Sequence, residues 1–345
     1  MNGNRISVVI RFHSLAALEQ LEQCLFSVCL QNTEDIEIIV VVKNFDQAQK
    51  SIVEEVCLGQ PWLFAPIVKI VDCNATDDHD TRAEALNVGI TSASGRYIAF
   101  LDYDDVLYHQ CYETLKKLLQ ESKAILSFGR TRLAVMETIG DKPYVISKKK
   151  WFFWGDSRRD LWKGNFIVIH SYMIDKERLP IPLLVDTTFT RLEDYALLLR
   201  LSVEGDFAKT EDAVCEYRIP LGHELAEEAF GFDRSSDYEQ SHESVIWNMN
   251  TDKLATLRES LRVNMSLEQF SELMDELADL KKERKWLKEQ LEHSEQVWSK
   301  HLEEAELLSF RLLRSGHAAV SKPGLLKETV KTVRTFRKLF KPRNK

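Results

Sequence analysis

The sequence has no long apolar run and none of the common phosphate-binding fingerprints. No stretch approaches the roughly 20 apolar residues of a membrane-spanning helix. The opening MNGNRISVVIRF lacks the basic and long apolar segments of a secretory signal. No apolar run is followed by a GxGxxG or P-loop pattern. These absences argue against a membrane channel, a dehydrogenase and a kinase, and we expect a cytoplasmic protein.

Cysteine is sparse, and its spacing argues against a disulfide framework or a zinc site. The six cysteines form no CxxC pair, and most lie in apolar segments, where a buried thiol is the ordinary state. A hydrophobic fraction of 44% and a charged fraction of 29% allow a full core. At 345 residues the chain exceeds one usual domain, so we expect a catalytic core with an appended segment.

The net charge of -8 is unevenly distributed. From Gly316 onward nine Lys or Arg residues face one acid, Glu328, which gives +8 and leaves -8 - 8 = -16 for residues 1–315. An acidic body with a basic tail indicates that the tail alone seeks an anionic surface.

Short β-branched runs alternate with helical patterns over most of the chain. This rhythm predicts a mostly parallel sheet with helices on both faces, and therefore ligands at the carboxyl ends of the strands. A second helix and strand over 193–218 complete one domain, which we place at residues 1–245, with a linker at 246–265. The expected strands are 6–10, 36–42, 68–71 and 97–101, and the expected helices begin near 18 and 81.

Three acids directly follow the apolar strand RYIAFL. Clustered carboxylates repel one another unless a cation or water offsets them, and their hard oxygens suit Mg²⁺ or Mn²⁺. In an extended Asp102-x-Asp104 pattern both side chains point the same way, so one can hold a ribose or water while the other ligates a metal on a diphosphate. For Asp105 we favour capping of the following helix.

The run TRAEALNVGITSASGRYIAFLDYDDVL resembles the donor-site half of family 2 glycosyltransferases, which have the GT-A fold. The resemblance extends to ISVVIRFHSLAALEQLEQCLFSVCLQ, IEIIVVV, NFIVIHSYMIDKERL and RLEDYALLLRL, roughly residues 5–220. It implies an α/β GT-A fold, Rossmann-like with a mostly parallel central sheet, here followed by a long α-helical coiled coil.

The resemblance also implies roles for individual residues. Asp102 and Asp104 would bind the donor diphosphate through Mn²⁺ or Mg²⁺, and His223 could complete the metal sphere. Asp194, beside Glu193, would be the general base, although an acidic first helical turn also suits the helix dipole. The remaining candidates for donor binding are Phe12, Asn44, Arg82 and Asn87, while His170 would lie near the acceptor channel or serve as a structural residue.

The chain departs from the family pattern at two strand ends. Strand one ends in Arg11-Phe12-His13 where the family has a Pro-Thr-Tyr-like sequence, and Lys43-Asn44-Phe45-Asp46 replaces the usual acids after strand two. Asn44 can still bond a pyrimidine edge, because its amide both donates and accepts. The nucleotide identity therefore stays open, with a UDP-sugar favoured.

A long helix and a basic tail follow the domain. A capping box at Ser266 and Gln269 opens a run without Gly or Pro up to Gly316, and apolar heptads fit residues 266–314. We expect self-association there, with a single packed helix as the alternative. In the tail, 315–345, apolar residues share one face among Lys and Arg, typical of an interfacial membrane helix. The alternatives there are packing against a partner or the core, and nucleic-acid binding, which we do not favour.

These features together predict an inverting, metal-dependent transferase that is peripheral on the inner face of the cell membrane. A lipid-linked surface polysaccharide is the expected acceptor. The main alternative is a catalytically silent GT-A scaffold that recruits partners. A third option, a nucleotidyltransferase, lacks the Gly-rich loop that it would need after strand one.

Overall fold

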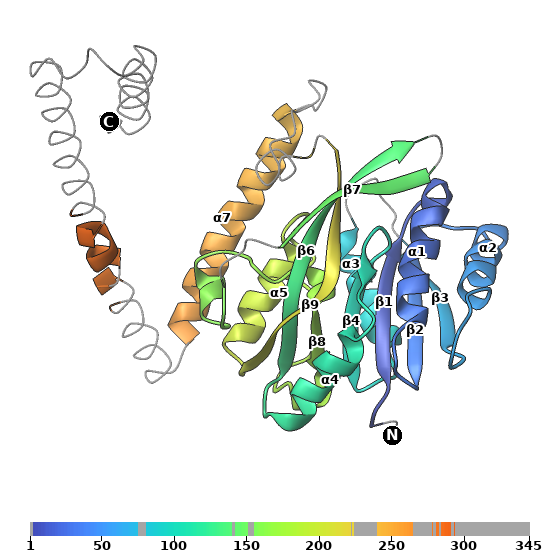
Figure 1. The fold of residues 1–345 in the computed structure, drawn as a ribbon, viewed down its shortest axis with the longest axis horizontal. Coiled ribbons are helices and arrows are strands. Elements are labelled where there is room, and N and C mark those ends of the chain that lie inside the picture. Colours follow the sequence, from blue (N-terminus) through green and yellow to red (C-terminus); the bar gives the residue numbers. More distant parts are fainter. Residues whose placement is uncertain are drawn as a thin grey trace, which may run out of the picture. The chain divides into compact units, whose positions relative to one another are not determined.

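The structure is a computed structural model that describes residues 3–74, 81–139, 142–150, 155–221, 223, 240–264 and short helical pieces between 278 and 293 (Figure 1). The chain divides into two compact units, Met1–Met265 and Ser266–Lys345. All of the predicted site residues lie in the first unit, which the following paragraphs describe by itself.

One mixed β-sheet forms the centre of the first unit. Its strand order is β3-β2-β1-β4-β8-β6-β9-β5, with β7 paired to β6. β1 lies between the parallel neighbours β2 and β4, whereas β8 is antiparallel to both β4 and β6. The prediction of a mostly parallel sheet is therefore correct for the first half only. The strands are β1 (Ile6–Phe12), β2 (Ile36–Val42), β3 (Ile67–Asp72), β4 (Tyr97–Asp102), β5 (Val106–Leu107), β6 (Leu126–Ile139), β7 (Lys142–Lys150), β8 (Tyr172–Asp175) and β9 (Phe207–Pro220).

Helices cover both faces of this sheet, as the alternating strand and helix patterns predict. Because successive strand residues point to opposite faces, Val8 and Ile10 belong to one core while Val9 belongs to the other. α1 (Leu18–Cys29), α2 (Gln47–Leu58) and α4 (Cys111–Glu121) pack into the first core. α3 (Arg82–Ser92), α5 (Glu193–Ser202) and α7 (Gln240–Asn264) pack into the second. All six cysteines are buried and free.

Short 3-10 turns join these elements: η1 (Leu15–Ala17), η2 (Asp160–Trp162), η3 (Ile169–Ser171) and η4 (Lys176–Arg178). Gly89 in α3 shows how closely the layers approach, since a Cβ there would come within 2.2 Å of Val9. The small residue lets α3 sit directly on β1.

The segment predicted as a linker, 246–265, is instead mostly helix α7, which packs on the domain. Leu254 is 3% exposed in the second core. Asn250 accepts the N–H of Thr190 at 3.1 Å, and the Arg258 guanidinium lies over the Tyr195 ring at 5.4 Å. The domain that was expected to end at residue 245 therefore uses α7 to cover α5.

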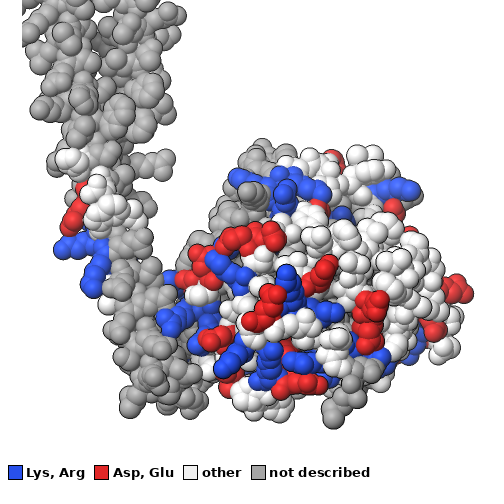
Figure 2. Space-filling model, turned by 60° about the horizontal axis from the view of Figure 1, so that its bottom comes forward, with Lys and Arg blue, Asp and Glu red and all other residues white. Residues whose placement is uncertain are grey.

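The second unit is described only in part. Its described pieces, including 284–290, are helical. Most of the predicted coiled coil and the whole basic tail, 315–345, lie outside the described residues. In the part of the chain that the structure describes, no helix is long and apolar enough to cross a membrane. Figure 2 shows a face of the first unit on which Lys and Arg side chains are interspersed with Asp and Glu side chains.

Candidate active site

The site begins where β4 leaves the core. The strand is fully buried up to Leu101, and Asp102 is its last residue. The Asp105 N–H donates to the Asp102 carbonyl at 3.1 Å, which closes a turn that carries Asp104 at the surface. A buried apolar strand thus delivers two accessible carboxylates to the carboxyl edge of the parallel strands, as the sequence predicts.

Arg11 lies directly beside Asp102, at the end of the neighbouring strand. The two residues are register partners of β1 and β4. Nε and Nη2 of Arg11 form a fork on Asp102, with contacts of 2.9 and 2.6 Å to Oδ1 and 2.8 Å to Oδ2. Nη1 donates to Glu193 Oε1 at 2.6 Å. One guanidinium therefore joins the end of β4 to the start of α5.

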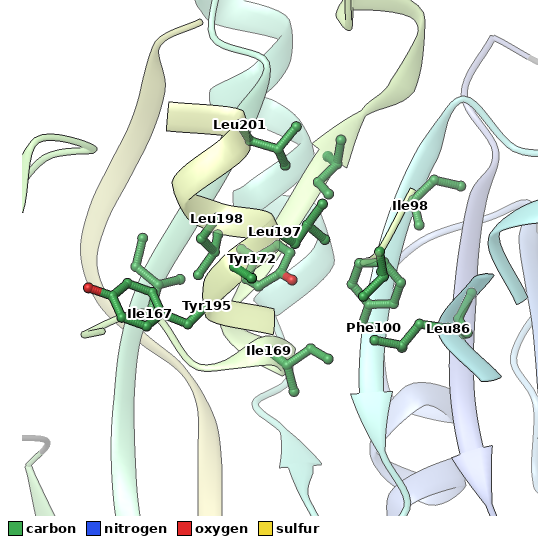
Figure 3. Close-up of a cluster of buried hydrophobic side chains, with 14 of the residues drawn as sticks. Leu86, Ile98, Phe100, Ile167, Ile169, Tyr172, Tyr195, Leu197, Leu198 and Leu201 are labelled. Carbon is green, nitrogen blue, oxygen red and sulfur yellow. The ribbon is translucent and has the colours of Figure 1, made fainter. Parts of the chain in front are cut away.

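Helix α5 presents the predicted general base on a rigid support. Figure 3 shows its side chains Leu197, Leu198 and Leu201 in the buried cluster that also holds Tyr172 of β8 and Phe100 of β4. The helix follows Leu192, which has a positive φ of 63°. Asp194 is partly exposed, and its Oδ1 accepts the N–H of Tyr195 at 2.8 Å. The buried leucines fix the helix and hence the direction of its first turn.

The carboxylates respond differently to this environment. Burial alone would raise the pKa of Asp102, but Arg11 outweighs it and the pKa is lowered. Arg11 lowers the pKa of Asp194 as well, but burial and then the charge of Glu193 outweigh it and raise this pKa to about 7. Burial and then Asp102 raise the pKa of Asp104 as well. Asp102 thus stays ionised while Asp194 can exchange a proton near neutral pH.

Asp105 does not cap a helix, contrary to the prediction, because α4 starts only at Cys111 and follows Gln110. Asp105 is instead buried, where its Oδ1 accepts the N–H of Arg218 at 2.7 Å and its Oδ2 lies 3.0 Å from His170 Nδ1. Burial lowers the pKa of His170 to about 4, so the ring is neutral. His170 is therefore a structural residue under the site, not a lining residue of an acceptor channel.

The two candidates for base recognition differ in accessibility. Phe12 is 1% exposed and packs edge-on against Phe45 and Tyr103, at 6.0 and 5.4 Å between ring centroids. The ring belongs to the core, and its predicted role in donor binding stays a prediction. Asn44 is exposed after β2, with a φ of 54° and its N–H on Asp72 Oδ1 at 3.0 Å.

The two donor-binding candidates on α3 also differ in their surroundings. Arg82 is exposed on the first turn, and its charge lowers the pKa of Asp102, although less than Arg11 does. Asn87 uses both ends of its amide on Val185, donating to the carbonyl and accepting the N–H at 2.8 Å each. Asn87 ties α3 to the segment before α5, so its sequence-based role in donor binding stays a prediction.

The three residues predicted to share a metal do not fit a common ion. Both oxygens of Asp102 already accept from Arg11. Within the described residues, no three His, Cys, Asp or Glu side chains are grouped to hold a metal, so His223 does not complete a set with Asp102 and Asp104. Asp104 alone offers an exposed carboxylate, and a magnesium-type ion bound by one carboxylate takes its other ligands from water and phosphate.

A family comparison shows what the first part of the domain is similar to. Residues 7–175 match the family model for Glycosyl transferase family 2. The match covers just under half of the chain. The matched stretch contains Arg11, Asp102 and Asp104 and ends at Asp175, so Glu193 and Asp194 lie beyond it. The match supports sugar transfer from a nucleotide-sugar, and the mixed α/β sheet fits a GT-A-like fold.

Two curated relatives share shorter stretches. Glycosyltransferase GlyA of Streptococcus pneumoniae serotype 4 is 29% identical over 126 residues, which is 36% of this chain and 16% of that protein. An uncharacterized glycosyltransferase of Rickettsia bellii is 47% identical over 45 residues, 13% of this chain and 6% of that protein. The matched stretches thus span only a small part of either relative.

Solved structures of S. aureus TarS are more distant. TarS 1–349 in complex with UDP gives a TM-score of 0.47 at 12% identity, covering 77% of this chain and 76% of that one. The complex with UDP-GlcNAc gives 0.48 at 13% identity and covers 80% of each chain. At these scores the likeness is too low to assign a ligand to this chain.

Arg11 is the site residue whose partners the sequence did not reveal. The pattern marks it only as a departure from the family at the end of strand one. A charged residue in a seven-residue strand that is otherwise buried indicates an ion pair, because a buried charge needs a partner. What the pattern cannot provide is the partner, since Glu193 is 182 positions away.

Proposed function

We propose that this chain is an inverting glycosyltransferase that moves a sugar from a nucleotide-diphosphate donor, preferably a UDP-sugar, to a glycan acceptor. One observation carries the proposal: acids from distant segments converge at one edge of the sheet. Asp102 at the end of β4 and Glu193 at the start of α5 share Arg11, which brings Asp194 to the carboxyl edge that carries Asp104.

In this mechanism Asp194 takes the proton of the acceptor hydroxyl. The hydroxyl oxygen forms a bond to the anomeric carbon while the bond from that carbon to the diphosphate oxygen breaks, and the electron pair leaves with the nucleotide diphosphate. Attack opposite the leaving group inverts the anomeric configuration. A carboxylate with a pKa near 7 suits this task, because it is both available as a base and basic enough to accept a proton.

The donor side is proposed to use Arg82, Asp104 and Asn44. Arg82 adds positive charge beside the acids, and charge that develops on a leaving diphosphate is stabilised by such groups. A divalent cation, when bound, would be held by Asp104 and would offset the diphosphate charge. Asn44, exposed after β2, is the candidate for the base edge.

The acceptor and location remain proposals from the sequence. The basic amphipathic face within residues 322–345 favours binding to an anionic membrane surface, and residues 266–314 favour a homo-oligomer. Together they favour a lipid-linked saccharide acceptor at the inner face of the cell membrane. A tail-deleted chain that still sediments with anionic vesicles and still glycosylates a lipid-linked acceptor at the full rate would contradict this part.

Catalysis by Asp194 predicts a distinct pH profile. The base works only when deprotonated, and its pKa is raised to about 7. We therefore expect kcat to rise about tenfold per pH unit below pH 7 and to level off above it. The measurement is kcat with one fixed pair of donor and acceptor from about pH 5.5 to 8.5. A flat profile over that range would contradict the assignment of Asp194 as the base.

Titration of nucleotides tests whether the site is a donor site. UDP and GDP are titrated calorimetrically into the protein with Mn²⁺ or with EDTA, in the wild type and in Asp104→Ala. We expect one nucleotide to bind, more tightly with Mn²⁺, and the Mn²⁺ effect to disappear in the variant. Binding of neither nucleotide under any condition would instead favour the alternative, a catalytically silent scaffold that recruits partners.

A further inference from the structure

The Arg11 guanidinium is fully engaged by two acids from separate elements. All three of its nitrogens donate: Nε and Nη2 to Asp102, and Nη1 to Glu193, at 2.6 to 2.9 Å. The side chain is only 16% exposed, and that of Glu193 is 6% exposed. Such a fork of charge-assisted bonds is strong and geometrically specific. It fixes the positions of both carboxylates.

This arrangement leaves Asp102 unsuited to bind a metal. Both of its oxygens accept from Arg11, and a divalent ion would have to displace a buried guanidinium that Glu193 also holds. The bound cation and the displaced guanidinium would then be two positive charges next to each other, which costs free energy at partly buried positions. Asp104, by contrast, lies two residues further along the chain and is exposed.

The same guanidinium supports the start of α5. Leu192, the residue before the helix, makes no side-chain capping hydrogen bond in the described structure. The contact from Glu193 to Arg11 therefore anchors the first turn to β1, while buried leucines anchor the rest of the helix. Asp194 is the next residue, so its position depends on this anchor.

We propose that Arg11 is a positioning residue that withholds Asp102 from divalent cations and holds the first turn of α5, with Asp194, against the acid cluster. Arg11 acts through Asp102 and Glu193 and needs no contact with the reacting atoms. The part that concerns turnover rests on the proposed function. The part that concerns cation binding does not.

Cation binding is tested with Mn²⁺ alone, by the electron paramagnetic resonance signal of the free ion. With Arg11 in place, we expect Asp102→Asn to change the affinity for Mn²⁺ by no more than about twofold. Asp104→Asn should weaken this affinity about tenfold or more. Arg11→Met should free Asp102 and tighten Mn²⁺ binding about tenfold, and Asp102→Asn should cancel that gain. The proposal is overturned if Asp102→Asn alone weakens binding tenfold. The Asp102 and Asp104 variants decide this even if Arg11→Met does not fold.

The positioning role is tested by comparing kcat with donor affinity. Arg11→Lys keeps a positive charge but lacks the planar fork, so we expect kcat to fall about tenfold, and about a hundredfold in Arg11→Met. The dissociation constant of the nucleotide should stay within about threefold in both. Equal losses in kcat and nucleotide affinity would show that Arg11 binds the donor directly. If no nucleotide binds even to the wild type, the proposed function fails, while the Mn²⁺ result still decides the first part.

Discussion

Asp194→Asn is expected to lower kcat by about 10² to 10⁴, the usual contribution of a general base. The amide keeps the size of the side chain and can still accept the Tyr195 N–H, a bond of 2.8 Å in the structure. It cannot take a proton from the acceptor hydroxyl. Donor binding should persist, because Asp102, Asp104 and Arg82 are unchanged. Turnover of a nucleotide-sugar, together with calorimetric titration of the nucleotide, measures both quantities.

Two controls separate lost chemistry from lost structure. Asp252→Asn makes the same chemical change at an exposed site on α7 and should leave kcat within about twofold. Stability gives the second control. The pKa of Asp194 is raised in the folded state, so its ionisation opposes folding as pH rises from about 4 through 7. Asp194→Asn should therefore be at least as stable as the wild type at pH 8. A variant with near-normal kcat would remove Asp194 from the mechanism.

The parallel half of the sheet follows directly from local patterns. Continuous β-branched runs such as 36–42 are typical of strands buried on both faces, and β2 has those bounds. The acids after β4 were also placed correctly, because a buried apolar strand that ends in charge must end at the surface. Both inferences need only neighbours in sequence.

The second half of the sheet needed information that local patterns lack. β6 pairs in parallel with β9, and β8 is inserted between β4 and β6 in an antiparallel direction. Strand direction depends on which distant segments meet, and one strand's pattern is compatible with either direction. The same limit applies to α7. Its short apolar stripe identifies it as part of the domain only when the position of α5, against which it packs, is known.

Local patterns cannot decide the role of a residue whose type has both a structural and a chemical use. Asp105 and His170 have the chemistry of a site, but both are buried beneath it and face each other. Phe12 is the last residue of β1, whose carboxyl end lies at the site, yet its ring lies in the core. Burial decided these cases, and it depends on the Tyr103 ring packed on Phe12 and on the Arg218 backbone N–H bonded to Asp105, which no local spacing reveals.

Asp175→Asn is expected to lower the free energy of unfolding by about 3 kcal/mol, which makes it the largest stability effect that we predict. Its carboxylate is fully buried at the end of β8 and accepts from Arg96 at 2.6 and 2.9 Å, with Arg178 Nε at 3.0 Å. The amide would leave two guanidinium groups, each 25% exposed, without their buried counter-charge. Urea unfolding at constant pH measures the loss.

Glu177→Gln provides a matched control, because Glu177 faces the same arginine. Its carboxylate lies 3.6 Å from Arg96 Nε and is 49% exposed, so its loss should change stability by less than about 0.5 kcal/mol. Equal effects of the two variants would contradict the assignment of Asp175 as a buried anchor. Because Asp175 pairs with Tyr97 at the far end of β4 from Asp102, folded Asp175→Asn should keep normal nucleotide affinity. A loss of that affinity would mean that the anchor also sets the position of the acid cluster.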